Sequence, residues 1–295
     1  MLKICVNTLL FHTELYIIFH TYIKGVFNLN ILVTLNSGYI KPLCVMLRSL
    51  LKAHPHTDFE IYVINKSLSQ QDFEYLQDKI EDNNYRLHDI KICDDMLEDA
   101  PVTDRYPHEM YYRIFAARFL PENVDKILYL DPDLVVLKNL ENLYNTDLGQ
   151  NFFAAASHVN KPLQKINEIR LQMETKGPYI NSGVMLMNIK LLREQQDYAE
   201  IFEYIEKNKN ILFLPDQDII SAVYSDRIIA IDPYIYNMTE RMLLSPKSIK
   251  NDVDAQWVKE NSAIVHYCGR NKPWKDNYIG FLDGFYKEFA YGIDI

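Results

Sequence analysis

The sequence predicts an α/β fold: a single Rossmann-like domain built on a mostly parallel mixed sheet. Segments with strand-like and helix-like patterns alternate along the first half of the chain, which is typical of doubly wound sheets. The segment KILYL at 126–130 is apolar without interruption, as expected for a strand buried on both faces of a parallel sheet. The chain has 295 residues, of which 48% are hydrophobic, so it has ample material for a large core.

The first half of the chain contains four predicted strands and three predicted helices. Apolar residues at helical spacing follow Pro42, and Ser69 with Asp72 forms a capping-box pattern at the start of the next helix. The segment MYYRIFAARFLP is also predicted to be helical and to end at Pro121. The predicted strands are 31–35, 59–64, 86–93 and 126–130, and the predicted helices are 43–51, 69–80 and 110–121.

The second half is less regular, and its predicted elements are strands at 151–157, 183–189 and 262–269 and helices at 200–209 and 216–225. Acidic residues open the last of these helices, where they suit the positive end of the helix dipole. We expect residues 1–29 to be an N-terminal appendage, 30–275 to be the main domain and 276–295 to be a C-terminal tail.

Composition excludes some classes of function. The formal net charge of −9 and a pI near 5.4 disfavour nucleic-acid binding, which usually needs a basic face. The four cysteines are scattered without zinc-type spacing, so we expect a reduced, cytoplasmic protein.

The N-terminal segment is apolar, but His12, Glu14 and His20 interrupt it. A membrane span needs about 20 mostly apolar residues, and this segment has no such run. An interfacial helix is the alternative interpretation.

Asp131 and Asp133 follow the apolar strand in LYLDPDLVVLK. In an extended segment, positions i and i+2 project to the same side, and ligands of such sheets bind beyond the carboxyl ends of the strands. Two carboxylates beside diphosphate oxygens suit Mg²⁺ or Mn²⁺. The alternative is an ordinary Asp-Pro turn that ends a strand.

A second polar group follows the last predicted strand in HYCGRNKPWK. If His266 joined the two aspartates, its imidazole would favour Mn²⁺ over Mg²⁺. Lys272 is near enough in sequence to contact the same diphosphate as a point charge. A structural histidine and a solvated lysine are the alternatives.

Two further segments carry candidate site residues. LPDQDI places Asp216, Gln217 and Asp218 at a helix start, where they would recognise sugar hydroxyls or merely cap the helix. YINSG places Asn181 before a strand, where turn formation is the alternative role.

These four segments, in this order, resemble glycosyltransferase family 8, and the resemblance runs from about Asn30 to Trp274. It implies a nucleotide-sugar-binding domain of the glycosyltransferase A type. It also implies that a hexose, glucose or galactose, moves from a UDP-sugar to an acceptor hydroxyl with retention at the anomeric carbon. The implied cofactor is Mn²⁺, with Mg²⁺ as the alternative.

The resemblance assigns roles to individual residues. The implied metal ligands are Asp131, Asp133 and His266. The implied donor-binding residues are Thr34 and Asn36 at the uridine, Lys272 and the backbone near Gly269 at the diphosphate, and Arg113, Asn181, Asp216 and Gln217 at the sugar.

Three positions depart from the family pattern. Asn36 stands where the family often has an aspartate, and Gly38 precedes Tyr39 where the family has an Asn-Tyr pair. His158 replaces an aspartate that some family galactosyltransferases use near the acceptor, which argues against the same acceptor specificity.

Retention requires either a carboxylate nucleophile or attack on the same face as the leaving group. The group expected near the anomeric carbon is Gln217, and an amide is a poor nucleophile. We therefore expect same-face attack, with Asp216 and Asp218 as candidates for a transient covalent role.

The expected partners are a UDP-hexose and an acceptor glycan, glycolipid or glycoprotein, in the synthesis of lipopolysaccharide or another cell-surface glycan. The aromatic tail at 276–295 leaves peripheral contact with the inner face of the cell membrane open. Alternative functions are a metal-dependent sugar-nucleotide hydrolase or nucleotidyltransferase, and a non-catalytic UDP-sugar-binding subunit. Self-glycosylation on one of the 21 tyrosines is a further alternative.

Overall fold

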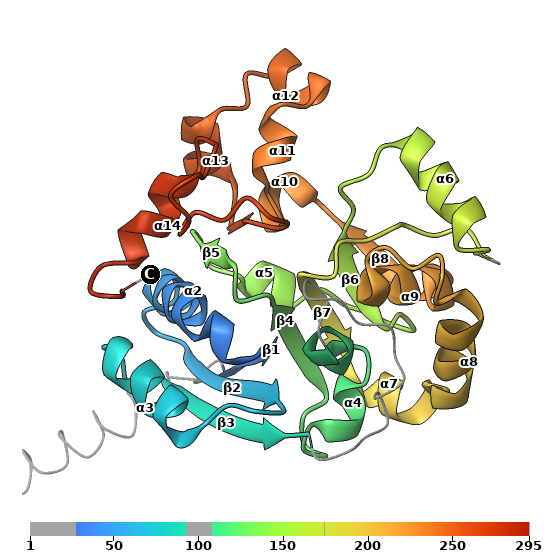
Figure 1. The fold of residues 1–295 in the computed structure, drawn as a ribbon, viewed down its shortest axis with the longest axis horizontal. Coiled ribbons are helices and arrows are strands. Elements are labelled where there is room, and N and C mark those ends of the chain that lie inside the picture. Colours follow the sequence, from blue (N-terminus) through green and yellow to red (C-terminus); the bar gives the residue numbers. More distant parts are fainter. Residues whose placement is uncertain (1–27, 93–107, 174, 295) are drawn as a thin grey trace, which may run out of the picture.

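A seven-stranded sheet forms the centre of the protein, with the strand order β3-β2-β1-β4-β7-β6-β8 (Figure 1). The structure, a computed structural model, describes residues 28–92, 108–173 and 175–294. The strands of this sheet are β1 (Asn28–Thr34), β2 (Asp58–Asn65), β3 (Tyr85–Lys91), β4 (Lys126–Leu130), β6 (Phe153–Ala156), β7 (Val184–Asn188) and β8 (Ile228–Ile231).

Strand β7 alone runs against the other strands of this sheet. Strands β3, β2, β1 and β4 pair in parallel, β7 pairs antiparallel with both β4 and β6, and β6 pairs parallel with β8. The predicted fold, an α/β domain with a mostly parallel mixed sheet, is therefore confirmed. Because β7 is reversed, its amino end lies at the same edge as the carboxyl ends of β1, β4 and β6.

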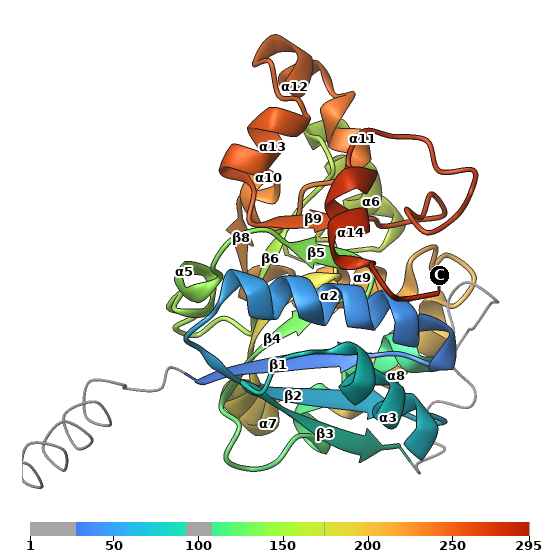
Figure 2. The ribbon, with the colours of Figure 1, turned by 90° about the vertical axis from the view of Figure 1, so that its left-hand side faces the viewer.

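Helices cover both faces of the sheet, and side chains alternate between two cores along each central strand (Figure 2). In β1, Ile31 and Val33 enter one core and Leu32 enters the other. The first core receives α2 (Ile40–Ala53), α3 (Gln70–Lys79), α5 (Glu141–Tyr144), α11 (Glu240–Leu243), α13 (Ala255–Asn261) and α14 (Asp283–Phe289). The second receives η2 (His108–Arg113), α4 (Ala116–Phe119), α7 (Ile189–Gln195), α8 (Tyr198–Asn208) and α9 (Pro215–Val223).

A second, two-stranded sheet stands apart from the first. It pairs β5 (Leu134–Val136) with β9 (Ile264–His266) in antiparallel register, so that Leu134 lies opposite His266. The predicted strand at 262–269 is thus shorter than expected and does not belong to the main sheet. The remaining elements are η1 (Ser37–Tyr39), α6 (Lys161–Arg170), η3 (Ser225–Arg227), α10 (Pro233–Tyr236) and α12 (Pro246–Lys250).

The predicted helix at 110–121 is wrong as a single element. The segment divides into the 3₁₀ helix η2 and the one-turn helix α4. Four consecutive side chains, those of residues 110–113, are buried. Residues 114 and 115 form a turn between these two elements, so the segment does not continue as one α-helix.

The predicted capping box is confirmed. Ser69 caps α3, and both hydrogen bonds of the capping box with Asp72 are present. Cys44 is buried and Cys268 is partly exposed, and both are free thiols. The predicted appendage falls almost wholly on residues 1–27, outside the described part of the chain. No helix among the described residues is both long and apolar enough to cross a bilayer.

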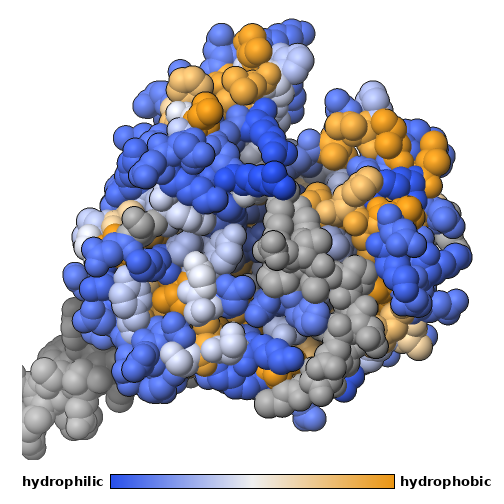
Figure 3. Space-filling view, viewed as in Figure 1, coloured by the Kyte–Doolittle hydropathy of each residue, from blue (hydrophilic) through white to orange (hydrophobic). Residues whose placement is uncertain are grey.

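Apolar atoms gather at two places on the face shown in Figure 3, over α6 and near α12. Large aliphatic side chains are exposed there: Leu163, Ile166 and Ile169 on α6, and Leu244 and Ile249 next to or within α12.

Candidate active site

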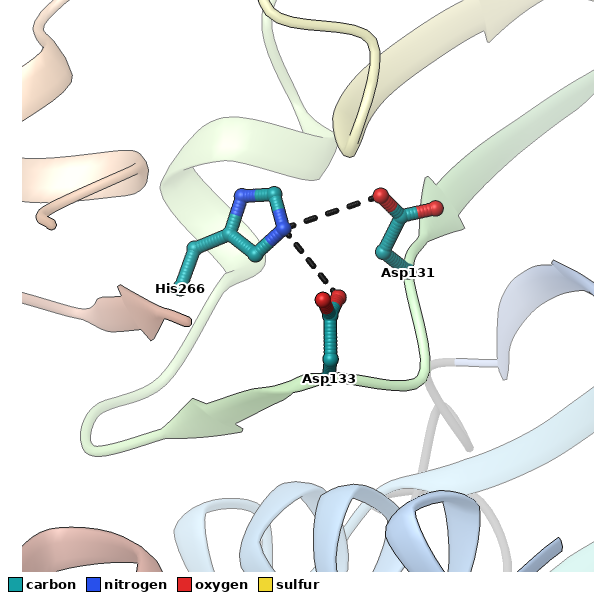
Figure 4. Close-up of side chains that lie close together, drawn as sticks. All are labelled: Asp131, Asp133 and His266. Carbon is teal, nitrogen blue, oxygen red and sulfur yellow. Dashed lines mark hydrogen bonds and ion pairs between the residues drawn. The ribbon is translucent and has the colours of Figure 1, made fainter. Parts of the chain in front are cut away.

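Asp131, Asp133 and His266 converge at the edge where β4 ends (Figure 4). One ligand atom from each residue lies within 4.8 Å of the other two. The Nε2 atom of His266 lies 3.2 Å from Oδ1 of Asp133 and 3.6 Å from Oδ2 of Asp131. Asp133 and His266 are buried and Asp131 is partly exposed, so the cluster opens on one side.

Glycine at position 183 permits this convergence. The Asp131 amide donates to the Gly183 carbonyl at 2.8 Å, which aligns the end of β4 with the start of β7. A Cβ atom at Gly183 would lie 2.3 Å from Cε1 of His266 and 2.7 Å from Oδ2 of Asp131. Any side chain there would therefore push the histidine and the carboxylate out of position.

Two cations balance the carboxylates. Lys272 pairs with Asp133, and Arg113 lies 2.9 Å from Oδ1 of Asp131 and 3.2 Å from Oδ2 of Asp216. Burial would raise the pKa of Asp133, but Lys272 and His266 outweigh it and hold that pKa well below its usual range. Asp133 is thus charged at neutral pH.

Tyr129 anchors Asp131 from inside the sheet. Its hydroxyl donates to Oδ1 of Asp131 at 2.6 Å and lies 3.2 Å from Oγ1 of Thr34. A phenol has one proton, so Thr34 donates to Tyr129. Burial raises the pKa of Tyr129 well above its usual value, which keeps this donor protonated. Thr34 therefore supports Asp131 through Tyr129.

Two side-chain amides, those of Asn181 and Asn237, determine which ring nitrogen of His266 carries a proton. The Gly183 amide can only donate, so Asn181 presents Oδ1 to it at 3.2 Å. The same oxygen accepts from Nδ2 of Asn237 at 3.0 Å, which leaves the Asn237 oxygen facing Nδ1 of His266 at 2.9 Å. Nδ1 of His266 therefore carries a proton, and in the neutral ring the lone pair of Nε2 faces Asp131 and Asp133.

Gln217 and Asp216 lie beside this cluster at the start of α9. Oε1 of Gln217 accepts from Nδ2 of Asn181 at 3.3 Å, and Ser182 donates to Asp216 at 2.7 Å. Burial raises the pKa of Asp216, with Arg113 and Ser182 opposing the shift. The structure thus brings together most of the predicted metal, diphosphate and sugar residues.

Asp218 points elsewhere, into a buried pocket of donors. Arg170 donates to both of its oxygens at 2.9 and 2.8 Å, and the Tyr179 hydroxyl donates at 2.6 Å. The amides of Phe213 and Leu214 complete the shell at 2.7 and 3.2 Å. Asp218 is 0% exposed, so no face of the carboxylate is open to a substrate.

The remaining predicted residues lie in loops at the same end of the sheet. Asn36 caps η1 by accepting from the Gly38 amide at 3.1 Å. Gly269 has φ of +92°, a backbone conformation that favours glycine. His158 donates from Nε2 to the Asn237 carbonyl at 2.7 Å, and burial, together with His266, lowers its pKa to about 4.

Comparison with known proteins decides the family. The sequence matches the profile described as glycosyl transferase family 8 over residues 30–278, which is most of the chain. The protein belongs to glycosyltransferase family 8. The resemblance predicted from the four sequence segments is therefore confirmed, and the protein is assigned to the glycosyltransferases.

Family 8 relatives are distant in sequence but extensive in coverage. The lipopolysaccharide 1,2-glucosyltransferase of Escherichia coli K12 is 25% identical over 247 residues, which cover 83% of this chain and 72% of the relative. General stress protein A of Bacillus subtilis 168 is 25% identical over 248 residues, which cover 82% of this chain and 86% of the relative.

The fold also matches solved structures. The crystal structure of galactosyltransferase LgtC in complex with donor and acceptor sugar analogs has a TM-score of 0.74 at 23% identity, covering 89% of this chain and 95% of that one. The glycosyltransferase GlyE of Streptococcus pneumoniae TIGR4 in its apo form has a TM-score of 0.69 at 22% identity, covering 90% and 60%. These likenesses support the glycosyltransferase A type of fold.

Sequence reasoning missed three residues that support the family 8 site. Tyr129 and Ser182 lie within predicted segments, and a search for donors beside each aspartate would have found them. Asn237 gave no sequence signal, because the segment DPYIYNMT resembles any helix start followed by a turn.

Proposed function

We propose that this family 8 protein is a retaining hexosyltransferase that moves glucose or galactose from a UDP-sugar to an acceptor hydroxyl. The observation that carries the proposal is the convergence of Asp131, Asp133 and His266, with Lys272 beside them. The relatives named for lipopolysaccharide glucosyl transfer suggest an acceptor on a cell-surface glycan or glycoconjugate.

The cluster fits a divalent metal. Oxygens of two carboxylates and the Nε2 atom of His266 converge within 4.8 Å, and these are donor atoms that a divalent cation accepts. This mixed oxygen and nitrogen set favours Mn²⁺ over Mg²⁺. When bound, the metal would neutralise charge on the diphosphate of the leaving UDP.

Asn237 is proposed as a positioning residue for His266. Metal-binding histidines commonly donate their other ring N–H to an oxygen, which sets the tautomer and the ring orientation. Asn237 accepts that proton through Oδ1 and joins the metal cluster to Asn181 and, through it, to Gln217. Metal binding and sugar binding would thus depend on one network.

Cationic side chains supply further stabilisation. Lys272 is buried and its pKa is raised by Asp133, although burial opposes the shift, so it carries a fixed positive charge at the cluster. Arg113 is buried between Asp131 and Asp216. Preorganised charges of this kind favour a transition state in which negative charge develops on the departing phosphate.

For the transfer step we propose same-face attack. The bond from the anomeric carbon to the phosphate oxygen breaks, and its electron pair leaves with UDP. The acceptor oxygen forms the new bond on the same face, and its proton passes to the departing phosphate oxygen. Gln217, whose amide is held by Asn181, would orient the sugar. The enclosed Asp218 carboxylate argues against its role as a nucleophile, and its proposed role is structural.

Product analysis tests the proposal. The purified protein is incubated with Mn²⁺, each of several UDP-hexoses and a panel of sugar acceptors, and the anomeric coupling constant of the product is measured by NMR. An α-linked product from an α-linked donor is expected. A β-linked product would exclude retention, whereas free sugar alone would identify a hydrolase, and UDP binding without any product would identify a binding subunit.

The variant Gln217→Ala tests the sugar assignment. We expect slower transfer with nearly unchanged affinity for UDP, because Gln217 would contact the sugar and not the nucleotide. A collapse of UDP affinity would show that the residue is wrongly placed.

A further inference from the structure

Helix α6 is unusual because it contributes no side chain to the core. Leu163, Ile166 and Ile169 are spaced three residues apart, which places them on one side of the helix. They are 48%, 58% and 69% exposed. An amphipathic helix of a globular domain normally turns its aliphatic side inward, and α6 turns it outward.

A second segment, residues 241–250, also exposes aliphatic side chains. It contains the end of α11 and all of α12. Leu244 is 72% exposed and Ile249 is 68% exposed. We call the two segments, 161–170 and 241–250, the aliphatic-basic surface.

The charges on this surface have one sign. The exposed charged side chains in the two segments are all cations: Lys161, Lys165, Arg241, Lys247 and Lys250. The single acidic residue in them, Glu168, is partly buried and pairs with Lys165 at 3.1 Å. The whole chain has a net charge of −9, so this concentration of cations is local.

The two segments lie in the upper half of both ribbon views, on separate projections, and apolar atoms mark each of them on the face in Figure 3. The surface also borders the active site. Helix α6 begins shortly after the carboxyl end of β6, and Arg170 at its last turn holds Asp218, next to Gln217.

We propose that the aliphatic-basic surface docks on a bilayer that contains anionic lipids. Exposed aliphatic side chains between lysines are the composition of interfacial segments, whose apolar groups enter the headgroup region while cations meet acidic headgroups. The proposal goes beyond the proposed transferase function and does not depend on it, because docking requires neither donor nor acceptor.

The C-terminal tail is a less suitable membrane contact, although its sequence first suggested one. Ile279, Phe281 and Tyr291 are exposed there. However, residues 276–295 contain four acidic side chains and one lysine, so an anionic bilayer would repel them. The tail therefore supplies matched control positions.

The experiment uses the full-length protein and vesicles sedimented after mixing. One set of vesicles contains phosphatidylglycerol with phosphatidylcholine, and the other contains phosphatidylcholine alone. We expect binding to the anionic vesicles that weakens as salt is raised. Lys247→Gln with Lys250→Gln should weaken binding about 30-fold, at roughly fivefold for each cation lost. Ile166→Ser with Ile169→Ser should also weaken it.

The control is Ile279→Ser with Phe281→Ser, which removes exposed apolar groups of similar exposure from the tail. It should leave binding unchanged, and UDP binding by all variants should match the wild type. Three outcomes would overturn the proposal: no preference for anionic vesicles, an equal loss in the control, or a change of oligomeric state in the variants that identifies the surface as a contact between copies.

Discussion

Two acidic groups in this protein, Asp218 and the pair Asp131 and Asp133, differ in their surroundings. Asp218 receives five hydrogen bonds from groups that belong to the fold. Asp131 and Asp133 receive theirs partly from Arg113 and Lys272, and both turn an oxygen toward the Nε2 atom of His266. A carboxylate whose oxygens accept all their hydrogen bonds from the fold stabilises the structure. Two carboxylates that face the Nε2 atom of an imidazole are suited to hold a cation.

The largest expected effect is on turnover, and it comes from replacing Asp131 or Asp133. Asp131→Asn and Asp133→Asn should each reduce UDP-sugar turnover by at least about 1,000-fold, because the metal that these residues are proposed to hold would contribute several kcal/mol to charge stabilisation. Turnover and the rise in Tm on addition of Mn²⁺ measure the effect.

Asp252→Asn is the control for this pair, since Asp252 is exposed and its φ of +50° is one that asparagine tolerates. Asp133→Asn also leaves Lys272 without its carboxylate partner, so Asp131→Asn is the cleaner variant. Turnover near the wild-type rate in the folded Asp131→Asn protein would remove the metal assignment.

Substitution of the enclosed Asp218 should lower the free energy of unfolding. Asp218→Ala leaves Arg170 partly buried without its partner, and breaking a buried pair costs about 3–5 kcal/mol in free energy of unfolding. Urea unfolding measures the loss. Lys165→Gln, which removes the exposed pair with Glu168, should cost less than about 1 kcal/mol. If Asp218→Asn were fully stable but inactive, a covalent role for Asp218 would return.

Asn237 contacts the imidazole of His266, which faces the Asp131 and Asp133 pair. Asn237→Ala should weaken Mn²⁺ binding about 10- to 100-fold, the usual loss when a histidine ligand loses its outer partner. Asn237→Asp retains an acceptor for Nδ1 of His266 and should keep most of the affinity. Calorimetry gives the affinities, and ¹⁵N NMR of the histidine ring gives the tautomer. Equal losses in both variants would contradict the positioning role.

The smallest expected effect is that of His158, whose ring bonds the Asn237 carbonyl. Its pKa is lowered to about 4 in the folded protein, against about 6.5 unfolded, so the unfolded chain binds more protons between these values. The free energy of unfolding should therefore fall as pH decreases through this window, by about 2 kcal/mol between pH 7 and pH 5. His158→Gln should flatten that part of the pH profile. An unchanged profile would show that another group causes it.

Sequence patterns predicted the central sheet well because burial on both faces leaves an uninterrupted apolar signal, as in β4. They failed at 110–121. In the sequence this segment resembles one helix, whereas in the structure it divides into η2 and α4, and tertiary contacts bury residues 110–113 one after another. Strands β5 and β8 were missed, because they have only three and four residues.

The candidate site was predictable where chemistry-bearing residues follow or end strands, as Asp131 and His266 do. The distinction between Asp216, Gln217 and Asp218 was not predictable, because three adjacent polar residues at a helix start differ only in their tertiary partners. Arg170 and Tyr179, which enclose Asp218, are 48 and 39 residues distant in sequence. The amide chain through Asn237 is likewise a product of tertiary contact.

Gly183 has a consequence for engineering. Its amide orients Asn181, its carbonyl aligns Asp131, and its missing side chain leaves room for His266. A combinatorial library aimed at a new donor sugar would therefore lose nearly every member that changes position 183, whichever sugar is selected. Diversity is better placed at residues that face the donor without supporting the metal cluster, so that each clone retains the chemistry while its specificity changes.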